Sequence, residues 1–111
     1  MHATIYHNPR CSKSRAALAL LTEAGATVTV IEYLKTPPTR DQLAALLIRA
    51  NLTPREALRT GETEAKPLKD ADDATILDAM AQHPILIERP IVATEKGVVI
   101  ARPPERVHEV L

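Results

Sequence analysis

The sequence predicts an α/β fold with a four-stranded mixed sheet. Three observations support this class. Short β-branched runs lie near both ends of the chain, an amphipathic helical pattern separates the first two runs, and a block of capped helical patterns fills the middle. Because domains typically contain about 100 to 150 residues, a chain of 111 residues predicts a single domain, residues 1–111.

The first part of the chain predicts a strand, a helix and a second strand. Residues Ala3–His7 alternate between apolar and polar side chains, as a half-buried strand does. After the Asn8-Pro9 turn, Ser12–Ala24 carries a helical apolar stripe, and Gly25 stands where a C-cap glycine belongs. Thr27–Tyr33 is β-branched. Such a unit, about thirty residues long, forms a right-handed crossover between parallel strands.

The middle of the chain, at about 39–83, predicts a helical insert. A capping box formed by Thr39 and Gln42 starts a helix that runs to about Ala50. The segments expected after it are a short helix that begins at Thr53, Pro54 and Glu56 and ends near Arg59, a polar loop over 61–71, and a helix over Asp72–Gln82.

The C-terminal part predicts two strands and a helix. Ile91–Ala93 and Val98–Ala101 are separated by a short turn, so they form an antiparallel hairpin. A short helix over Pro103–Leu111 closes the chain. The order βαβ, helical insert, ββα is that of a thioredoxin-like fold.

Composition argues against several classes of function. Fourteen basic and fourteen acidic side chains give no net charge, unlike a nucleic-acid binder. With no Phe or Trp and two Tyr, stacking on bases is poorly supported. No apolar stretch is long enough for a membrane span, and Met1 leads into the first strand without a signal-peptide pattern. A lone thiol then fits a reducing compartment, so we expect a cytoplasmic protein.

The chemistry of the sequence centres on Cys11, its one cysteine. A single cysteine forms no internal disulfide, and no histidine has metal-site spacing with it, so we expect no metal. It follows a turn and precedes a helix, where free N–H groups and nearby cations favour the thiolate. His7 lies four residues upstream. The alternative is that Cys11 is a small buried apolar residue.

Two familiar cysteine motifs do not fit. A phosphatase-type loop requires an arginine six residues after the cysteine, and that position is Ala17. The segment Cys11-Ser12-Lys13-Ser14 has serine where a redox Cys-x-x-Cys motif has its second thiol.

Several segments together resemble the glutaredoxin-coupled arsenate reductase family over essentially the whole chain. Because this sequence stops at Leu111, whereas well-characterised members carry a longer C-terminal tail, it looks most like a short branch of that family. The matching segments are Ile5-Tyr6-His7-Asn8-Pro9-Arg10-Cys11, the Tyr33-Leu34 and Pro37-Pro38 turn, His83-Pro84-Ile85-Leu86-Ile87-Glu88-Arg89-Pro90-Ile91-Val92, and Arg102-Pro103-Pro104.

The resemblance implies a site. Cys11 would be the nucleophile, Arg59, Arg89 and Arg102 would hold the oxyanion, and His7 would assist the thiolate. The proline after Arg89 would follow a cis peptide bond. From the residues alone, Arg59 could equally pair with a helix dipole, Arg102 could be an ordinary exposed charge, and His7 could bond the loop backbone. Lys13 and Arg15 could contact the anion or glutathione, but we expect them to be solvated helix charges.

The activity implied is reduction of arsenate to arsenite without a bound cofactor. The reduction takes two electrons, and the one thiol of this chain cannot supply both and end as an internal disulfide. Glutathione is the expected co-substrate, and glutaredoxin would clear the mixed disulfide on Cys11. Two alternatives are a non-enzymatic, redox-linked regulatory protein and a general glutathione-dependent thiol–disulfide module.

Overall fold

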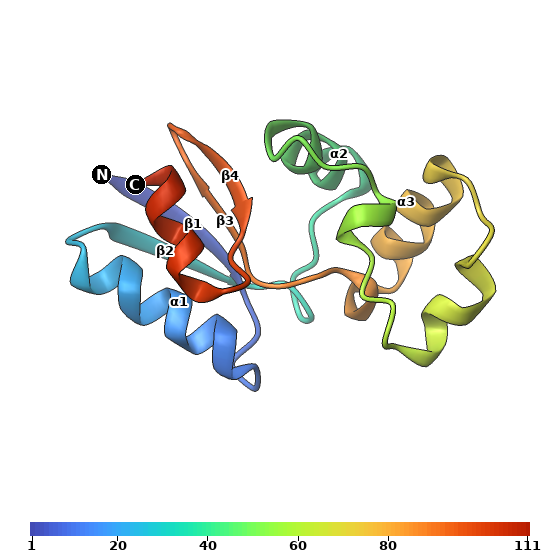
Figure 1. Cartoon of the computed structure of the whole chain (residues 1–111), viewed down its shortest axis with the longest axis horizontal. Coiled ribbons are helices and arrows are strands. Elements are labelled where there is room, and N and C mark those ends of the chain that lie inside the picture. Colours follow the sequence, from blue (N-terminus) through green and yellow to red (C-terminus); the bar gives the residue numbers. More distant parts are fainter. The chain divides into compact units, whose positions relative to one another are not determined.

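The computed structural model describes all 111 residues and confirms an α/β fold with a four-stranded mixed sheet (Figure 1). The chain divides into two compact units, Met1–Thr36 with Arg89–Leu111, and Pro37–Glu88. The second unit contains the predicted helical insert, and the count of one domain stays a prediction. The elements are β1 (His2–His7), α1 (Ser12–Glu23), β2 (Thr27–Glu32), α2 (Arg40–Arg49), η1 (Arg55–Ala57), η2 (Thr63–Leu68), α3 (Asp73–Gln82), η3 (Pro84–Leu86), β3 (Ile91–Thr94), β4 (Gly97–Ile100) and η4 (Pro104–Val110).

The first unit holds the whole sheet, in the order β2-β1-β3-β4. Strands β1 and β2 are parallel, whereas β3 runs antiparallel to both β1 and β4. The predicted βαβ unit and C-terminal hairpin are therefore confirmed. Gly25 ends α1 with a φ of 82°, a left-handed conformation that glycine adopts without steric cost.

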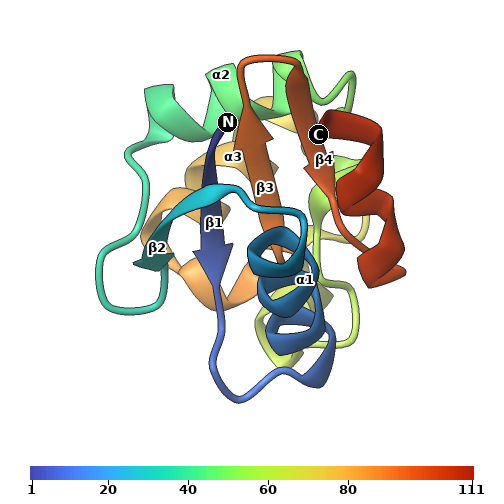
Figure 2. The ribbon, with the colours of Figure 1, turned by 90° about the vertical axis from the view of Figure 1, so that its left-hand side faces the viewer.

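An aliphatic core holds this unit together. Figure 2 shows α1 lying across one face of the sheet, with η4 beside it at the C-terminus. Strand β1 buries alternate residues, as its sequence pattern predicts. The buried residues of the cluster are Ala3, Ile5, Ala17, Leu21, Val92, Val99, Ala101, Val107 and Val110. Their packing holds α1 against β1, and the Cys11 turn connects these two elements.

In the second unit α2 packs against α3. The capping box is present, because Thr39 accepts the Gln42 N–H and the Gln42 side chain accepts the Thr39 N–H. The short helix expected to end near Arg59 is wrong in length. It is the single 3-10 turn η1, after which Leu58 pairs with Ile87 in an isolated antiparallel bridge.

The polar loop expected over 61–71 is also wrong, because the segment contains η2. Ala65 and Leu68 are buried within it, so burial of two apolar side chains orders a stretch that looks polar as a whole. The Arg55 guanidinium donates to the carbonyls of Leu68, Lys69 and Ala71 at the end of this segment. These bonds tie the Arg55 side chain to the backbone that follows η2.

The Arg89–Pro90 peptide bond is cis, as the resemblance predicts, and so is Arg102–Pro103. No helix is both long enough and apolar enough to cross a membrane.

Candidate active site

The turn between β1 and α1 is held by hydrogen bonds to its own backbone. The Asn8 carbonyl accepts the Cys11 N–H at 3.0 Å, and the Asn8 side-chain oxygen accepts the Arg10 N–H at 3.0 Å. The Arg15 guanidinium donates to the Pro9 carbonyl at 2.8 Å. Arg15 is therefore not the freely solvated charge expected from the sequence. These bonds fix the backbone that carries Cys11.

Cys11 is the N-cap residue of α1. Its backbone is extended, and its carbonyl accepts the Arg15 N–H at 3.0 Å. Its side chain makes no capping bond. The sulfur is half-buried and lies beside the N–H groups of the first helical turn. The alternative that Cys11 is a buried apolar residue does not fit this position.

The environment lowers the pKa of the Cys11 thiol. Partial burial opposes this by raising the pKa, but it is outweighed by hydrogen bonding from the backbone N–H groups of Ser14 and Lys13, the positive charge of Arg89 and the Arg102 side chain. A helix N-terminus and adjacent cations are the settings in which thiolates form near neutral pH.

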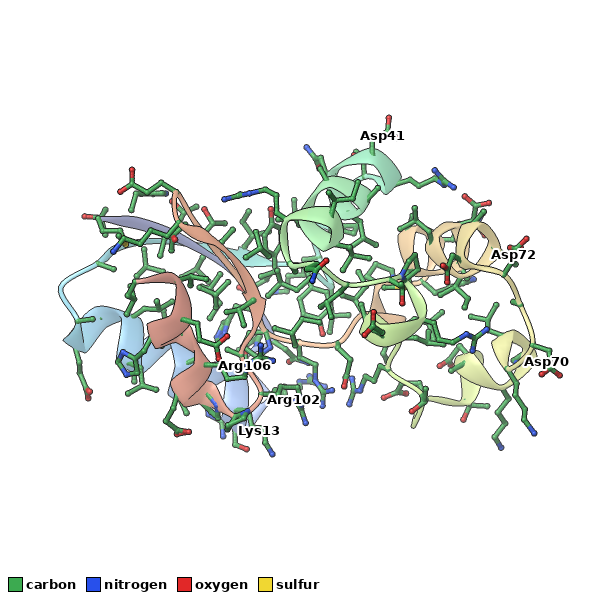
Figure 3. All side chains as sticks on the ribbon, turned by 45° about the horizontal axis from the view of Figure 1, so that its top comes forward. Lys13, Asp41, Asp70, Asp72, Arg102 and Arg106 are labelled. Atoms are coloured by element: carbon green, nitrogen blue, oxygen red, sulfur yellow. The ribbon has the colours of Figure 1, made fainter.

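Two predicted arginines meet at this sulfur. The Arg102 Nη1 atom lies 4.0 Å from the Cys11 Sγ and donates to the Arg89 carbonyl at 3.1 Å. Arg102 follows β4, whereas Arg89 precedes β3, so the antiparallel hairpin brings them together. Figure 3 labels Arg102 and Lys13, which lie at the same end of this unit. Arg102 is thus part of the cysteine site and not an isolated surface charge.

His7 is buried at the end of β1 and contacts Ser14. The His7 Nδ1 atom lies 2.7 Å from the Ser14 hydroxyl, which also accepts the Asn8 N–H at 3.0 Å. Burial lowers the pKa of His7; Glu32 raises it and Arg15 lowers it further. The imidazole is therefore neutral at neutral pH, and its hydrogen bond goes to Ser14 rather than to the sulfur.

Ser14 itself was not expected to take part in the site. Its side chain is fully buried and links His7 to the turn. A signal was present in the sequence, because a serine in the first helical turn, three residues after Cys11, reaches back to the preceding turn.

Arg59 belongs to the second unit, so its convergence with Cys11 stays a prediction. Its side chain forms an ion pair with Glu62 at 3.1 Å, and its backbone N–H donates to the Leu86 carbonyl at 2.7 Å. The bridge between Leu58 and Ile87 runs alongside this bond. Arg59 is therefore tied to the strand-like segment that leads into Arg89 in the sequence.

No group of three or more His, Cys, Asp and Glu side chains could hold a metal ion. The fold and the site together define a class: a thioredoxin-like protein with a single activated cysteine at the start of its first helix and arginine side chains beside it.

Comparison with known proteins narrows this class. The ArsC family profile matches residues 6–110. Arsenate reductase of Rhizobium meliloti (strain 1021) is 46% identical over 115 residues, covering 100% of this chain and 82% of that protein. Arsenate reductase of Escherichia coli (strain K12) is 44% identical, covering 97% and 79%. The solved arsenate reductase from Vibrio cholerae superposes with a TM-score of 0.94 at 43% identity, covering 100% of this chain and 98% of that chain. The chain belongs to the ArsC family.

Proposed function

We propose that this protein is an arsenate reductase that uses glutathione as its co-substrate and glutaredoxin as its recycling partner. The observation that carries the proposal is the Cys11 sulfur, whose pKa is lowered and which lies beside the guanidinium of Arg102. The family membership and the arsenate reductase names of relatives 41–50% identical to this chain support the choice of substrate.

Arginine side chains suit this substrate. Arsenate is a tetrahedral oxyanion, and planar guanidinium groups bind pairs of such oxygens through two parallel hydrogen bonds. In this proposal Arg89 and Arg102 bind arsenate next to Cys11, and Arg59 supplies a third guanidinium, as the family resemblance implies. The positive charges offset repulsion between the thiolate and the arsenate anion.

In the first step the Cys11 thiolate attacks arsenic. A sulfur–arsenic bond forms, one arsenate oxygen leaves as water after taking up protons, and arsenic stays in the pentavalent state. This is nucleophilic catalysis by an activated thiol.

In the second step glutathione completes the reduction. Its thiolate attacks the Cys11 sulfur, the sulfur–arsenic bond breaks, and the bonding pair stays on arsenic, which becomes trivalent and leaves as arsenite. The two sulfurs lose two electrons and arsenic gains two, so Cys11 ends as a mixed disulfide with glutathione. A glutaredoxin thiolate then attacks the glutathione sulfur, which frees Cys11 and moves the glutathione to glutaredoxin.

We assign His7 and Ser14 positioning roles. Neutral His7 holds the Ser14 hydroxyl, and Ser14 offers its backbone N–H to the Cys11 sulfur. His7 therefore assists the thiolate through Ser14.

A coupled assay tests the proposal. With glutathione, glutaredoxin, glutathione reductase and NADPH, the protein should consume NADPH only when arsenate is added, and Cys11→Ser should abolish this. Because the Cys11 side chain makes no capping bond, Cys11→Ser should keep the circular dichroism of the wild type. Absence of arsenate-dependent turnover, with turnover of glutathione mixed disulfides instead, would contradict the proposal and favour a general thiol–disulfide module.

A further inference from the structure

A second concave feature lies beside the Cys11 turn, within the same unit. It is a cavity of about 190 Å³ at the ends of the parallel strands β1 and β2. The lining residues are His7, Asn8, Pro9, Arg10, Glu32, Leu34 and Lys35. In open α/β sheets, ligands bind beyond the carboxyl ends of parallel strands.

The charges around this cavity form a distinct pattern. Two cations, Arg10 and Lys35, flank one carboxylate, Glu32. The Arg10 guanidinium makes no ion pair or hydrogen bond within the protein, and the Glu32–Lys35 pair is loose, at 3.5 Å with the lysine side chain 79% exposed. An exposed pair of this kind contributes little to stability, so a ligand can replace it at small cost.

The backbone holds these groups in place. The Glu32 carbonyl accepts the Lys35 N–H at 2.9 Å, which closes the turn after β2. The backbone of Arg10, which also lines the cavity, is fixed by the bond from its N–H to the Asn8 side chain. The exposed Leu34 side chain adds an apolar surface to this cavity.

We propose that this cavity binds the γ-glutamyl end of glutathione. That end carries one ammonium and one carboxylate on the same α-carbon, and the cavity offers the complementary set: Glu32 for the ammonium, and Lys35 with Arg10 for the carboxylate. Leu34 contacts the two methylene groups that connect this α-carbon to the γ-amide. Charge-assisted hydrogen bonds of this kind give both orientation and affinity.

The position of the cavity suits the second step of the reaction. Arg10 precedes Cys11 by one peptide bond, and the cysteinyl residue of glutathione is one amide bond from its γ-glutamyl group. Seating that group beside Arg10 brings the glutathione thiol to the Cys11 turn. This inference rests on the proposed function, because it assigns a site to the co-substrate named there.

A binding experiment that needs no arsenate chemistry tests the site. S-methylglutathione, which cannot form a disulfide, is titrated into the full chain and followed by amide NMR shifts and calorimetry. We expect shifts at Asn8, Arg10, Leu34 and Lys35, and about ten-fold weaker binding to Lys35→Glu and to Glu32→Gln. S-methyl-cysteinylglycine lacks the γ-glutamyl group, so it should bind the wild type about ten-fold more weakly than S-methylglutathione does. Its affinity for the two variants should equal its affinity for the wild type.

Matched controls remove the same charges elsewhere. Lys69→Glu and Glu95→Gln change exposed side chains that line neither this cavity nor the Cys11 site, and both should bind like the wild type. The coupled arsenate assay is run on the same proteins, where Lys35→Glu should raise the KM for glutathione about ten-fold and leave the KM for arsenate unchanged.

The outcomes separate the two proposals. One outcome would overturn this site and leave the proposed function standing. In that outcome the protein turns over arsenate, but neither the two substitutions nor loss of the γ-glutamyl group weakens ligand binding. Binding with the expected losses, without arsenate turnover, would support the site and contradict the proposed function. No binding of S-methylglutathione at millimolar concentration would overturn the site.

Discussion

Removing the charge of Arg102 should raise the pKa of the Cys11 thiol. The Arg102 Nη1 atom is 4.0 Å from the sulfur, and this side chain is one of the groups that lower the pKa. Arg102→Gln removes the charge and leaves a planar but shorter amide that no longer reaches the sulfur. The thiolate then loses its nearest side-chain donor while the backbone N–H groups and Arg89 remain.

The distance between the Arg102 guanidinium and the Cys11 sulfur determines how strongly the charge stabilises the thiolate. Two unit charges 4 Å apart attract by about 1 kcal/mol in water and about 4 kcal/mol at an effective dielectric constant of about 20. Cys11 and Arg102 are both half-buried, so solvent screens part of this attraction and the lower end of the range applies. Removing the charge should therefore destabilise the thiolate by about 1 kcal/mol, and the pKa of Cys11 should rise.

The pH dependence of iodoacetamide alkylation measures this directly, because only the thiolate reacts. Arg102→Lys should keep most of the lowered pKa but bind arsenate more weakly, since an ammonium lacks the guanidinium fork. Arg106→Gln is the matched control, because its guanidinium pairs with Glu109 at 2.9 Å. An unchanged thiol pKa in Arg102→Gln would refute the electrostatic account of this site.

Three further outcomes follow from the same contacts. Ser14→Ala leaves His7 and a buried N–H without their partner, so urea unfolding should show a loss of about 1–3 kcal/mol, against no loss for the exposed Ser12→Ala. Burial lowers the pKa of His7 below its usual 6.5. As the pH falls, His7 therefore becomes protonated in the unfolded chain at a higher pH than in the folded protein. The free energy of unfolding should therefore decline below about pH 6.5, and His7→Gln should flatten that part of the profile. Arg59→Gln should raise the KM for arsenate about ten-fold or more without changing the pKa of Cys11, whereas Arg55→Gln should lower stability instead; an unchanged KM in Arg59→Gln would remove Arg59 from the oxyanion site.

Local signals in the sequence predicted most of the elements, because helix caps and turns depend on neighbouring residues. The capping box at Thr39 and Gln42 and the glycine after α1 are of this kind. The order of η2 was missed because it depends on burial of Ala65 and Leu68 and is accompanied by bonds from Arg55, which reaches carbonyls 13 to 16 residues further along the chain. No window of sequence around residues 61–71 contains that contact.

The residues of the site likewise divide into those that local sequence signals predict and those that depend on contacts distant in the sequence. Cys11 could be placed at a helix start from the turn before it and the stripe after it, and both are local. Its contact with Arg102 spans 91 positions, and no spacing rule connects residues so far apart. The resemblance to a family supplied Arg89 and Arg102, and the hairpin of β3 and β4 explains why they meet.

The distribution of charge around Cys11 also determines which groups control the pH dependence of catalysis. Backbone N–H groups do not titrate, and arginines stay protonated at any physiological pH. His7 is neutral near pH 7, because burial lowers its pKa. The groups that stabilise the thiolate are therefore constant across this range. It follows that, among the groups of the protein at this site, Cys11 rather than His7 changes its ionisation across this range, and in the proposed reaction the pH dependence combines this ionisation with the second ionisation of arsenate itself.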